Sequence, residues 1–168
     1  MNIICDIDGT LADATHRLHY IQNKPKDWTS FFAQVRNDAP HDDIRWIVDQ
    51  LYFNPDSGEN SVNLHLVSGR PERTREDTVT WLRDMLVWHP WVENAGYRLT
   101  RVYYRLHMRK DGDRRADDIV KEEILDTALT PAGVTPTNTL AVFDDRDRVV
   151  AMWRRRGFRV LQVAPGDF

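Results

Sequence analysis

Apolar residues in this chain gather in five short runs that are separated by longer segments of mixed polarity. The runs span residues 3–5, 62–67, 97–106, 139–143 and 158–163. A short run of apolar or β-branched residues between turn residues is typical of a strand that is buried on both faces. Because these strands alternate with helical segments, the pattern predicts an α/β fold, with a Rossmann-like five-stranded parallel sheet and right-handed crossovers.

Helical periodicity, with apolar residues three and four positions apart, marks the segments between the strands. The predicted helices cover about 41–53, a segment that begins at Pro71, about 117–128, and a segment through Trp153 that ends at Gly157. In the second of these helices, Val79, Leu82 and Leu86 are expected to line the buried face. These helices then cover the two faces of the sheet.

A polar and aromatic insertion, residues 13–40, follows the first strand. It carries two short helical candidates, about 15–22 and 28–35, which are broken by Lys24-Pro25-Lys26 and by Ala39-Pro40. An insertion between a strand and its crossover helix predicts a small lid. We therefore expect residues 1–168 to form a single domain with a helical lid at 13–40.

The charge of the chain limits how it could bind nucleic acid. With a net charge of −3 and a pI near 6.1, it has no overall basic character, so any site for a polyanion must be a local patch. Basic residues cluster between residues 98 and 121 and between residues 154 and 159, where solvated helix faces explain them as well as a binding role does. The tryptophans at 81, 88 and 91 are expected to serve in packing rather than in base stacking.

The cellular compartment is also indicated by the sequence. Cys5 is the single cysteine, so no internal disulfide can form and a reducing interior suits the protein. No apolar run approaches the ~20 residues of a membrane span, and no signal peptide precedes the first strand. We expect a soluble cytoplasmic protein without a membrane partner.

Two carboxylates, Asp6 and Asp8, come directly after the first strand and just before Gly9. In extended backbone they point to the same side, at the carboxyl end of a strand, where open α/β sheets bind ligands. Because carboxylates this close repel each other, the pair indicates a metal ion, an acid–base pair or both. A calcium loop does not fit, since its twelfth position requires a glutamate and holds Arg17. Taken alone, the stretch from Asp6 to Gly9 could also be a surface turn without a functional role.

Further polar groups follow other predicted strands or lie on a crossover helix. Ser68-Gly69-Arg70-Pro71 offers a hydroxyl and exposed amides where a strand opens into a helix, which is typical of an anion cradle. Asp117 and Lys121 lie four residues apart on one helix face, where a surface salt bridge is the simpler interpretation. Asp144 and Asp145 end another buried strand. Because parallel strands bring such ends to one edge of the sheet, we expect these groups to form one site.

The chain resembles the haloacid dehalogenase superfamily of phosphotransferases in four motifs that occur in the expected order. The matching residues are Asp6-Ile7-Asp8-Gly9-Thr10, Ser68, Lys121 and Asp144-Asp145. Residues 109–124 and 152–168 are also similar to the 3′-phosphatase domains of bacteriophage polynucleotide kinase-phosphatases, and this similarity is weak between residues 14 and 60. No G-x-x-x-x-G-K-[ST] loop occurs, so we expect the 5′-kinase half of those enzymes to be absent.

The resemblance implies a haloacid dehalogenase fold and the removal of 3′-terminal phosphates from DNA or RNA, as a repair step before ligation. It leaves 2′,3′-cyclic phosphates open as a further substrate, and a separate kinase or ligase open as a partner. The implied cofactor is Mg²⁺. Its implied ligands are Asp6, the Asp8 carbonyl, and Asp144 or Asp145.

The resemblance also implies a role for each residue of the site. Asp6 would attack phosphorus to give an aspartyl-phosphate, while Asp8 protonates the leaving oxygen and later activates water. Ser68 and Lys121 would hold the phosphoryl oxygens. The residues implied to contact the substrate or to orient the lysine are Arg17, Arg70 and Asp117.

Two other functions stay open from the sequence. A 5′(3′)-deoxyribonucleotidase shares an Asp-Asp-Arg after the fourth strand and the same chemistry on smaller substrates. A non-catalytic binding module could keep the fold without turnover. The match over residues 112–123 favours the 3′-phosphatase over the first alternative, and the complete set of acidic residues disfavours the second.

Overall fold

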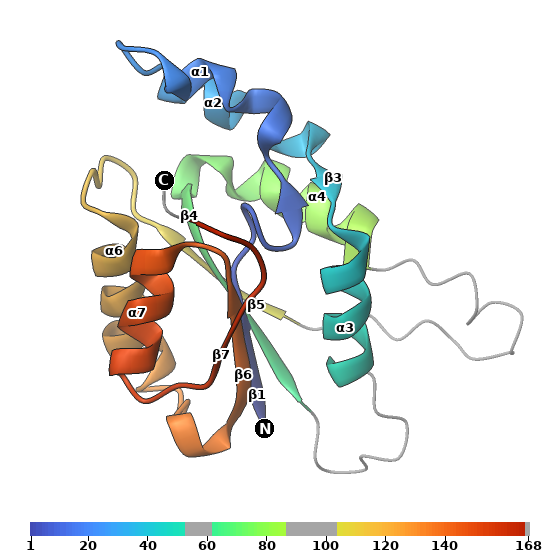
Figure 1. Ribbon diagram of the computed structural model, residues 1–168, viewed down its shortest axis with the longest axis vertical. Coiled ribbons are helices and arrows are strands. Elements are labelled where there is room, and N and C mark those ends of the chain that lie inside the picture. Colours follow the sequence, from blue (N-terminus) through green and yellow to red (C-terminus); the bar gives the residue numbers. More distant parts are fainter. Residues whose placement is uncertain (53–61, 87–103, 167–168) are drawn as a thin grey trace, which may run out of the picture.

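A parallel sheet forms the centre of the protein, whose computed structural model describes residues 1–52, 62–86 and 104–166. The strands are β1 (Asn2–Cys5), β4 (Asn63–Pro71), β5 (Tyr104–Arg109), β6 (Thr139–Asp144) and β7 (Val160–Gln162). They pair in the order β5-β4-β1-β6-β7, and every pairing is parallel (Figure 1). The predicted α/β fold with a five-stranded parallel sheet is therefore confirmed.

The order of the strands fixes where a ligand can bind. From the central β1 the chain builds β4 and β5 on one side, and it then crosses back to build β6 and β7 on the other side. The strand order reverses between β1 and β6. In open α/β sheets, the carboxyl ends of the strands at such a reversal form the crevice that binds ligands.

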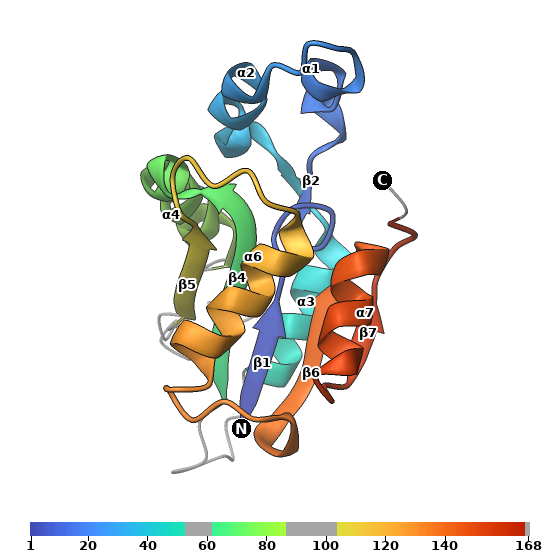
Figure 2. The ribbon, with the colours of Figure 1, turned by 90° about the vertical axis from the view of Figure 1, so that its left-hand side faces the viewer.

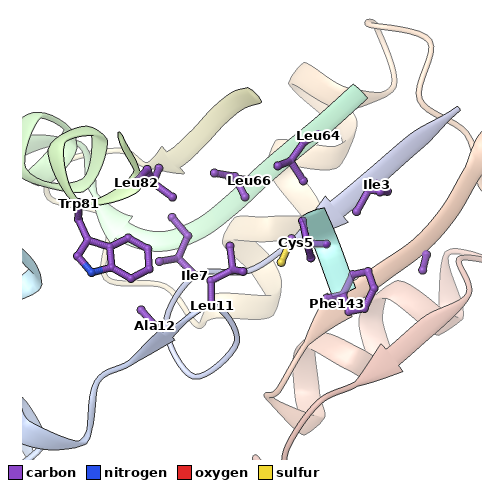
Figure 3. Close-up of a cluster of buried hydrophobic side chains, with 12 residues drawn as sticks. Ile3, Cys5, Ile7, Leu11, Ala12, Leu64, Leu66, Trp81, Leu82 and Phe143 are labelled. Atoms are coloured by element: carbon purple, nitrogen blue, oxygen red, sulfur yellow. The ribbon is translucent and has the colours of Figure 1, made fainter. Parts of the chain in front are cut away.

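Two layers of helices bury the sheet. The helices α3 (Asp42–Tyr52) and α4 (Arg75–Leu86) cover one face, and α6 (Asp117–Ile124) and α7 (Asp147–Arg155) cover the other (Figure 1). On the first face, Trp81 and Leu82 of α4 belong to one buried cluster with side chains of β1, of β4 and of the turn after β1 (Figure 3). On the second face, Trp153 of α7 is fully buried. Each large apolar side chain buried in this way stabilises the fold by about 1.5–3 kcal/mol.

Some predicted boundaries and faces were wrong. The segment after β4 begins with a 3₁₀ turn, η3 (Glu72–Thr74), because Pro71 ends the strand rather than entering the helix. On α4, Val79 is 39% exposed, whereas Trp81 and Leu82 are buried. The helix α6 ends in a π-helical turn, η4 (Leu125–Leu129), which turns Leu125 and Leu129 inward. A further 3₁₀ turn, η5 (Pro136–Asn138), leads into β6.

Parts of three predictions lie outside the described residues. They concern the start of the strand expected from Tyr97, the side chain of Leu86, and the packing of Trp88 and Trp91. Trp81 is only 3% exposed, in agreement with a packing role. Among the helices that the structure describes, none is long and apolar enough to cross a membrane.

The insertion after β1 rises from a short two-stranded ribbon. Its strands, β2 (Ala12–Asp13) and β3 (Ala39–Pro40), pair antiparallel. Between them lie η1 (Thr15–Arg17), α1 (His19–Gln22), α2 (Trp28–Ala33) and η2 (Val35–Asn37). Asp27 caps α2 by accepting the Ser30 backbone N–H at 2.9 Å. Figures 1 and 2 show these short helices above the carboxyl ends of the strands. Their action as a lid stays a prediction.

A pair of histidines lies on β4 and β5. The rings of His65 and His107 are stacked with their centroids 5.6 Å apart, and His65 is only 1% exposed. Burial, together with the neighbouring His107 and Arg105, lowers the pKa of His65 to about 4. In the described part of the chain, Nε2 of His65 has no hydrogen-bond partner. A proton on His65 would therefore be poorly compensated.

This pair makes folding stability depend on pH. Between the ordinary histidine pKa of 6.5 and the lowered value of about 4, the unfolded chain binds more protons at this position than the folded chain does. Stability contributed by neutral His65 is thus lost as the pH falls through this range, by about 2–3 kcal/mol. Urea unfolding across the range should show a clearly smaller loss for His65→Leu than for the wild type. Equal losses would contradict the prediction.

Candidate active site

Three aspartates meet at the carboxyl ends of β1 and β6. Asp6 follows β1, and the parallel register sets Cys5 opposite Phe143, so the next residues of the two strands are neighbours. The backbone N–H of Asp6 donates to the Phe143 carbonyl at 2.9 Å. One carboxylate oxygen from each of Asp6, Asp144 and Asp145 lies within 4.8 Å of the other two, and all three residues are buried. The predicted convergence of these acids is present in the structure.

Lys121 reaches this cluster from α6. Its Nζ lies 2.9 Å from Asp6 Oδ1, 2.9 Å from Asp144 Oδ2 and 3.6 Å from Asp117 Oδ2. The side chain of Lys121 is fully buried, so a surface salt bridge with Asp117, the simpler interpretation from sequence, is wrong. Asp117 lies one helical turn earlier on α6, and its carboxylate is the most distant of the three acids that contact the Lys121 ammonium.

Burial and mutual repulsion shift the acidity of these groups. Burial raises the pKa of Asp6 well above its ordinary value, against the attraction of Lys121, and the neighbouring carboxylates raise it further. Burial and the adjacent Asp144 raise the pKa of Asp145 to about 6. Burial by itself would lower the pKa of Lys121, but the surrounding carboxylates outweigh it, and the net shift is strongly upward. The lysine is charged, and one ammonium does not compensate the acids around it.

The cluster fits a divalent cation. When all three are ionised, these carboxylates and the Lys121 ammonium carry a net charge of −2 in a buried space. Carboxylate oxygens are the ligands that Mg²⁺ prefers, and a charge of +2 would relieve the repulsion that adds to burial in raising the pKa of Asp6 and Asp145. Asp6, Asp144 and Asp145 are the residues that could hold such an ion. The Asp8 carbonyl as a further ligand stays a prediction.

Two glycines allow the chain to approach these acids closely. Gly9 has φ +82°, and a Cβ there would lie 2.2 Å from Asp145 Oδ2. A Cβ at Gly69 would lie 2.4 Å from Asp117 Oδ1. At Gly9 the positive φ and the close approach both require glycine, whereas at Gly69 any larger residue would have to displace the Asp117 carboxylate.

A second group of charges adjoins the first, at Asp8. Its Oδ1 accepts from Nη2 of Arg17 at 2.6 Å, and from Nη2 and Nε of Arg70 at 2.6 and 2.9 Å. Both arginine side chains are fully buried, and that of Asp8 is 27% exposed. Burial by itself would raise the pKa of Asp8, but Arg70 and Arg17 outweigh it, and the net shift is downward. Asp8 is therefore ionised in this arrangement.

Asp38, at the end of the insertion, is a residue of this group that the sequence analysis missed. It accepts from Nε and Nη2 of Arg17 at 2.7 and 2.8 Å and from Nη2 of Arg70 at 2.5 Å. His16 Nε2 lies 2.8 Å from the same carboxylate, and Trp81 Nε1 donates to the Asp38 carbonyl at 2.8 Å. Charge balance is the signal that could have indicated Asp38. Two buried arginines that share one aspartate require a second acid to compensate their charge.

The strand end at β4 contributes a hydroxyl and a carbonyl. Ser68 is fully buried, and its Oγ accepts the Arg70 backbone N–H at 3.2 Å. The Gly69 carbonyl accepts from Nε of Arg109 at 2.9 Å, while Nη2 of Arg109 donates to Asp117 Oδ1 at 3.0 Å. The sequence analysis placed Arg109 in a basic patch and in the similar segment 109–124, without a role of its own. In the structure it connects the end of β4 to Asp117.

The nine residues predicted for the site therefore form two adjoining groups. The first contains Asp6, Asp117, Lys121, Asp144 and Asp145. The second contains Asp8, Arg17 and Arg70, with Ser68 against the Arg70 backbone.

Two buried polar atoms nearby, Thr10 Oγ1 and Arg17 Nη1, have no hydrogen-bond partner in the described part of the chain. The arrangement offers a carboxylate nucleophile, an acid–base carboxylate and cationic donors in one place. The individual roles stay predictions.

Several other residues of the basic patches pair with acids at the surface. Arg115 pairs with Asp113 and Glu123, and Arg155 and Arg156 pair with Glu122. Such solvated pairs contribute little to stability and leave these side chains occupied. Arg98 and Arg101 lie outside the described residues.

Known proteins resemble this chain in both sequence and fold. Residues 1–168 match the family model of the polynucleotide kinase PNKP phosphatase domain. A chain of the Pnkp1/Rnl/Hen1 complex is 25% identical with a TM-score of 0.68, and the match covers 99% of this chain and 46% of that one. A second structure, of the Pnkp1/Rnl/Hen1 RNA repair complex, is 25% identical with a TM-score of 0.64, covering 99% of this chain and 43% of that one. This chain thus spans less than half the length of these relatives.

Two haloacid dehalogenase proteins share the fold at lower identity. A haloacid dehalogenase-like hydrolase from Streptococcus pneumoniae is 14% identical with a TM-score of 0.55, and the match covers 96% of this chain and 83% of that one. A family enzyme from Bacteroides thetaiotaomicron, solved as a magnesium complex, is 13% identical with a TM-score of 0.52, covering 99% and 94%. These matches agree with the haloacid dehalogenase fold implied by the four motifs.

Proposed function

Since this chain belongs to the family of polynucleotide kinase PNKP phosphatase domains, we propose that it removes the 3′-terminal phosphate from DNA or RNA through an aspartyl-phosphate intermediate. The family and the fold identify the chain as a phosphoric monoester hydrolase. The observation that carries the proposal is the convergence of Asp6, Lys121, Asp144 and Asp145 beside the Asp8–arginine group. This set supplies what transfer of a phosphoryl group to a carboxylate requires.

The first half-reaction would transfer the phosphoryl group to Asp6. One carboxylate oxygen of Asp6 attacks phosphorus as the bond from phosphorus to the sugar 3′-oxygen breaks, and the leaving oxygen takes a proton from Asp8. Lys121 and the Ser68 hydroxyl would hold the phosphoryl oxygens in line with the attack. Asp117, 3.6 Å from the Lys121 ammonium, would keep that ammonium aimed at the reacting centre.

The second half-reaction would return Asp6 to its starting state. Asp8, two residues away, takes a proton from a water molecule, whose oxygen attacks phosphorus as the bond between phosphorus and the Asp6 oxygen breaks, and inorganic phosphate leaves. The arginines that lower the pKa of Asp8 favour the ionised form that this step needs. A phosphate dianion beside Arg17 and Arg70 would weaken their hold on Asp8, which favours the protonated form needed in the first step.

A divalent cation would assist both steps. Mg²⁺ held by Asp6, with Asp144 or Asp145, would screen the negative charge of the substrate phosphate from the attacking carboxylate. The charge left over in this cluster supports such an ion, as does the magnesium complex of the related fold from Bacteroides thetaiotaomicron.

The two arginines are proposed to bind the substrate phosphate. Arg17 supports this role because its buried Nη1 has no partner in the described part of the chain, although its other nitrogens are bonded. A guanidinium offers a planar set of donors that suits a phosphate group. Because Arg17 comes from the insertion and Arg70 from β4, substrate would draw these two parts of the protein together.

Phosphate release from a 3′-phosphorylated oligonucleotide tests the proposed function. With Mg²⁺ present, we expect a kcat/KM for this substrate at least tenfold above that for a 5′-mononucleotide, which lacks the strand that the larger site would hold. Addition of EDTA should reduce turnover to background. Hydrolysis of 5′-mononucleotides alone would instead assign a nucleotidase activity. Matched DNA and RNA oligonucleotides, and one with a 2′,3′-cyclic end, would define the substrate class.

Partner enzymes are a second part of the proposal. The similar chains come from complexes named Pnkp1/Rnl/Hen1, and one of these is described as an RNA repair complex. A phosphatase that leaves a 3′-hydroxyl produces the end that a ligase joins. We therefore propose that a separate kinase or ligase acts on the same nucleic-acid ends.

A further inference from the structure

One face of α2 is lined by aromatic residues. Trp28, Phe31 and Phe32 lie three and four residues apart, so they share one side of this short helix. The rings of Trp28 and Phe32 are nearly parallel, with centroids 5.8 Å apart, and Trp28 meets Phe31 edge-on at 5.7 Å. Trp28 is nevertheless 45% exposed. An exposed tryptophan on an ordered aromatic face is a ready stacking surface.

This face is turned toward the site rather than away from the molecule. The Phe31 ring lies against the guanidinium of Arg17, with 4.2 Å between the ring centroid and Cζ, and Arg17 contacts Asp8. The Phe32 ring lies 5.7 Å from Cζ of Arg73, in the turn that directly follows the strand carrying Arg70. Figure 2 shows α2 above the strand ends and the start of α4. The Phe31 ring thus contacts both Trp28 and Arg17, an arginine of the site.

Cations surround the aromatic face. Nζ of Lys26 lies 5.5 Å from the centroid of the Trp28 ring, and Arg73 lies over Phe32. Aromatic rings interleaved with cations are the arrangement that binds single-stranded nucleic acid, because bases stack on the rings while phosphates meet the charges. The occupant that fits both features is a strand that ends in the site.

We propose that Trp28 is a stacking platform for the base of one of the last two nucleotides of a single-stranded 3′ end, with Lys26 and Arg73 beside the strand. The proposal rests on the proposed function, since it extends the same site along its substrate. The short path from Trp28 through Phe31 to Arg17 limits the stacked base to this end of the strand. The platform would explain how the enzyme selects a polynucleotide over a small phosphate ester.

Oligonucleotide binding in EDTA tests the platform without turnover. Anisotropy of a labelled single-stranded oligonucleotide with a 3′-phosphate should show about a tenfold weaker Kd for Trp28→Ala, in keeping with the loss of one stacked base. Trp28→Phe, which keeps a ring, should recover most of the affinity. Trp46→Ala is the matched control, because Trp46 is 55% exposed on α3, outside the site, and its loss should leave the Kd unchanged.

Abasic substitution identifies the stacked base. An oligonucleotide without a base at the last or the preceding position should lose about tenfold in wild-type affinity at one of them, and Trp28→Ala should add no further loss there.

Unchanged affinity of Trp28→Ala, or a wild type that binds no oligonucleotide, would overturn the platform. If Trp28→Ala lowers kcat/KM for the oligonucleotide and for p-nitrophenyl phosphate by the same factor, with no change in Kd, Trp28 supports only the packing of the insertion. A wild type that shows the Trp28-dependent binding but releases no phosphate would refute the proposed function and leave the platform standing.

Discussion

Replacing Asp6 with asparagine is expected to reduce kcat on a 3′-phosphorylated oligonucleotide by about 10⁴-fold or more, because an amide oxygen cannot form the aspartyl-phosphate. The substitution removes one of three carboxylates that repel one another around Lys121, so the fold should not suffer. Oligonucleotide affinity should remain within a few-fold of the wild type. Single-turnover phosphate release and anisotropy measured on the same preparation separate these two effects.

The control for this experiment is Asp84→Asn, an exposed aspartate on α4 whose nearest partner is the adjacent Arg83. It should turn over like the wild type, and thermal unfolding in EDTA should show that Asp6→Asn melts no lower than the wild type. If Asp6→Asn keeps more than about one hundredth of wild-type kcat, Asp6 is not the nucleophile. A non-catalytic binding module would show no turnover in the wild type either.

Replacing Asp38 with alanine should lower both stability and turnover. Its buried carboxylate accepts hydrogen bonds from Arg17 and Arg70, and without it the single carboxylate of Asp8 must compensate two buried guanidinium groups. Removing one partner from a buried ion pair costs about 3–5 kcal/mol of unfolding free energy. Because the arginines would lose their fixed positions, kcat should also fall by about 10²-fold. Urea unfolding and steady-state kinetics measure the two losses.

Asp77→Ala is the matched control, since Asp77 pairs with Arg36 at 3.8 Å and both side chains are largely solvated. Its loss should cost less than about 1 kcal/mol. Asp38→Asn keeps the shape and some acceptors, so it should fall between alanine and the wild type in both measurements. A stability loss for Asp38→Ala no larger than that for Asp77→Ala would show that the buried charge network does not hold the insertion to the sheet.

The sequence pattern was a reliable guide to the sheet. Continuous apolar runs such as residues 139–143 are shorter than most helices and favour buried strands, and their alternation with helices leaves few topologies. The pattern was less reliable for helix faces. On α4 the periodicity favoured Val79, which is 39% exposed, whereas Trp81 is buried and its indole N–H donates to the Asp38 carbonyl. That contact joins segments 43 residues apart and has no local signature.

The acids at the strand ends were predictable for the same reason. Asp6 and Asp144 are fixed to strands that must be parallel neighbours, so their meeting follows from topology. Lys121 was ambiguous, because a lysine four residues after an aspartate reads as a surface pair until its burial is known. The gathering of the other polar groups at one edge of the sheet favoured a shared site that includes Lys121, and the resemblance to haloacid dehalogenases agreed with it.

By itself, the sequence determined the α/β architecture and the set of strand-end acids, because periodicity and chain connectivity act over short distances. Only the tertiary structure decided the second half of the site, where the Asp38 carboxylate and the aromatic face of α2 come from an insertion with weak patterning. The physical reason is charge compensation in a buried space. Which acid neutralises Arg17 and Arg70 depends on how the insertion folds back over the sheet, and that geometry is set by contacts between distant segments.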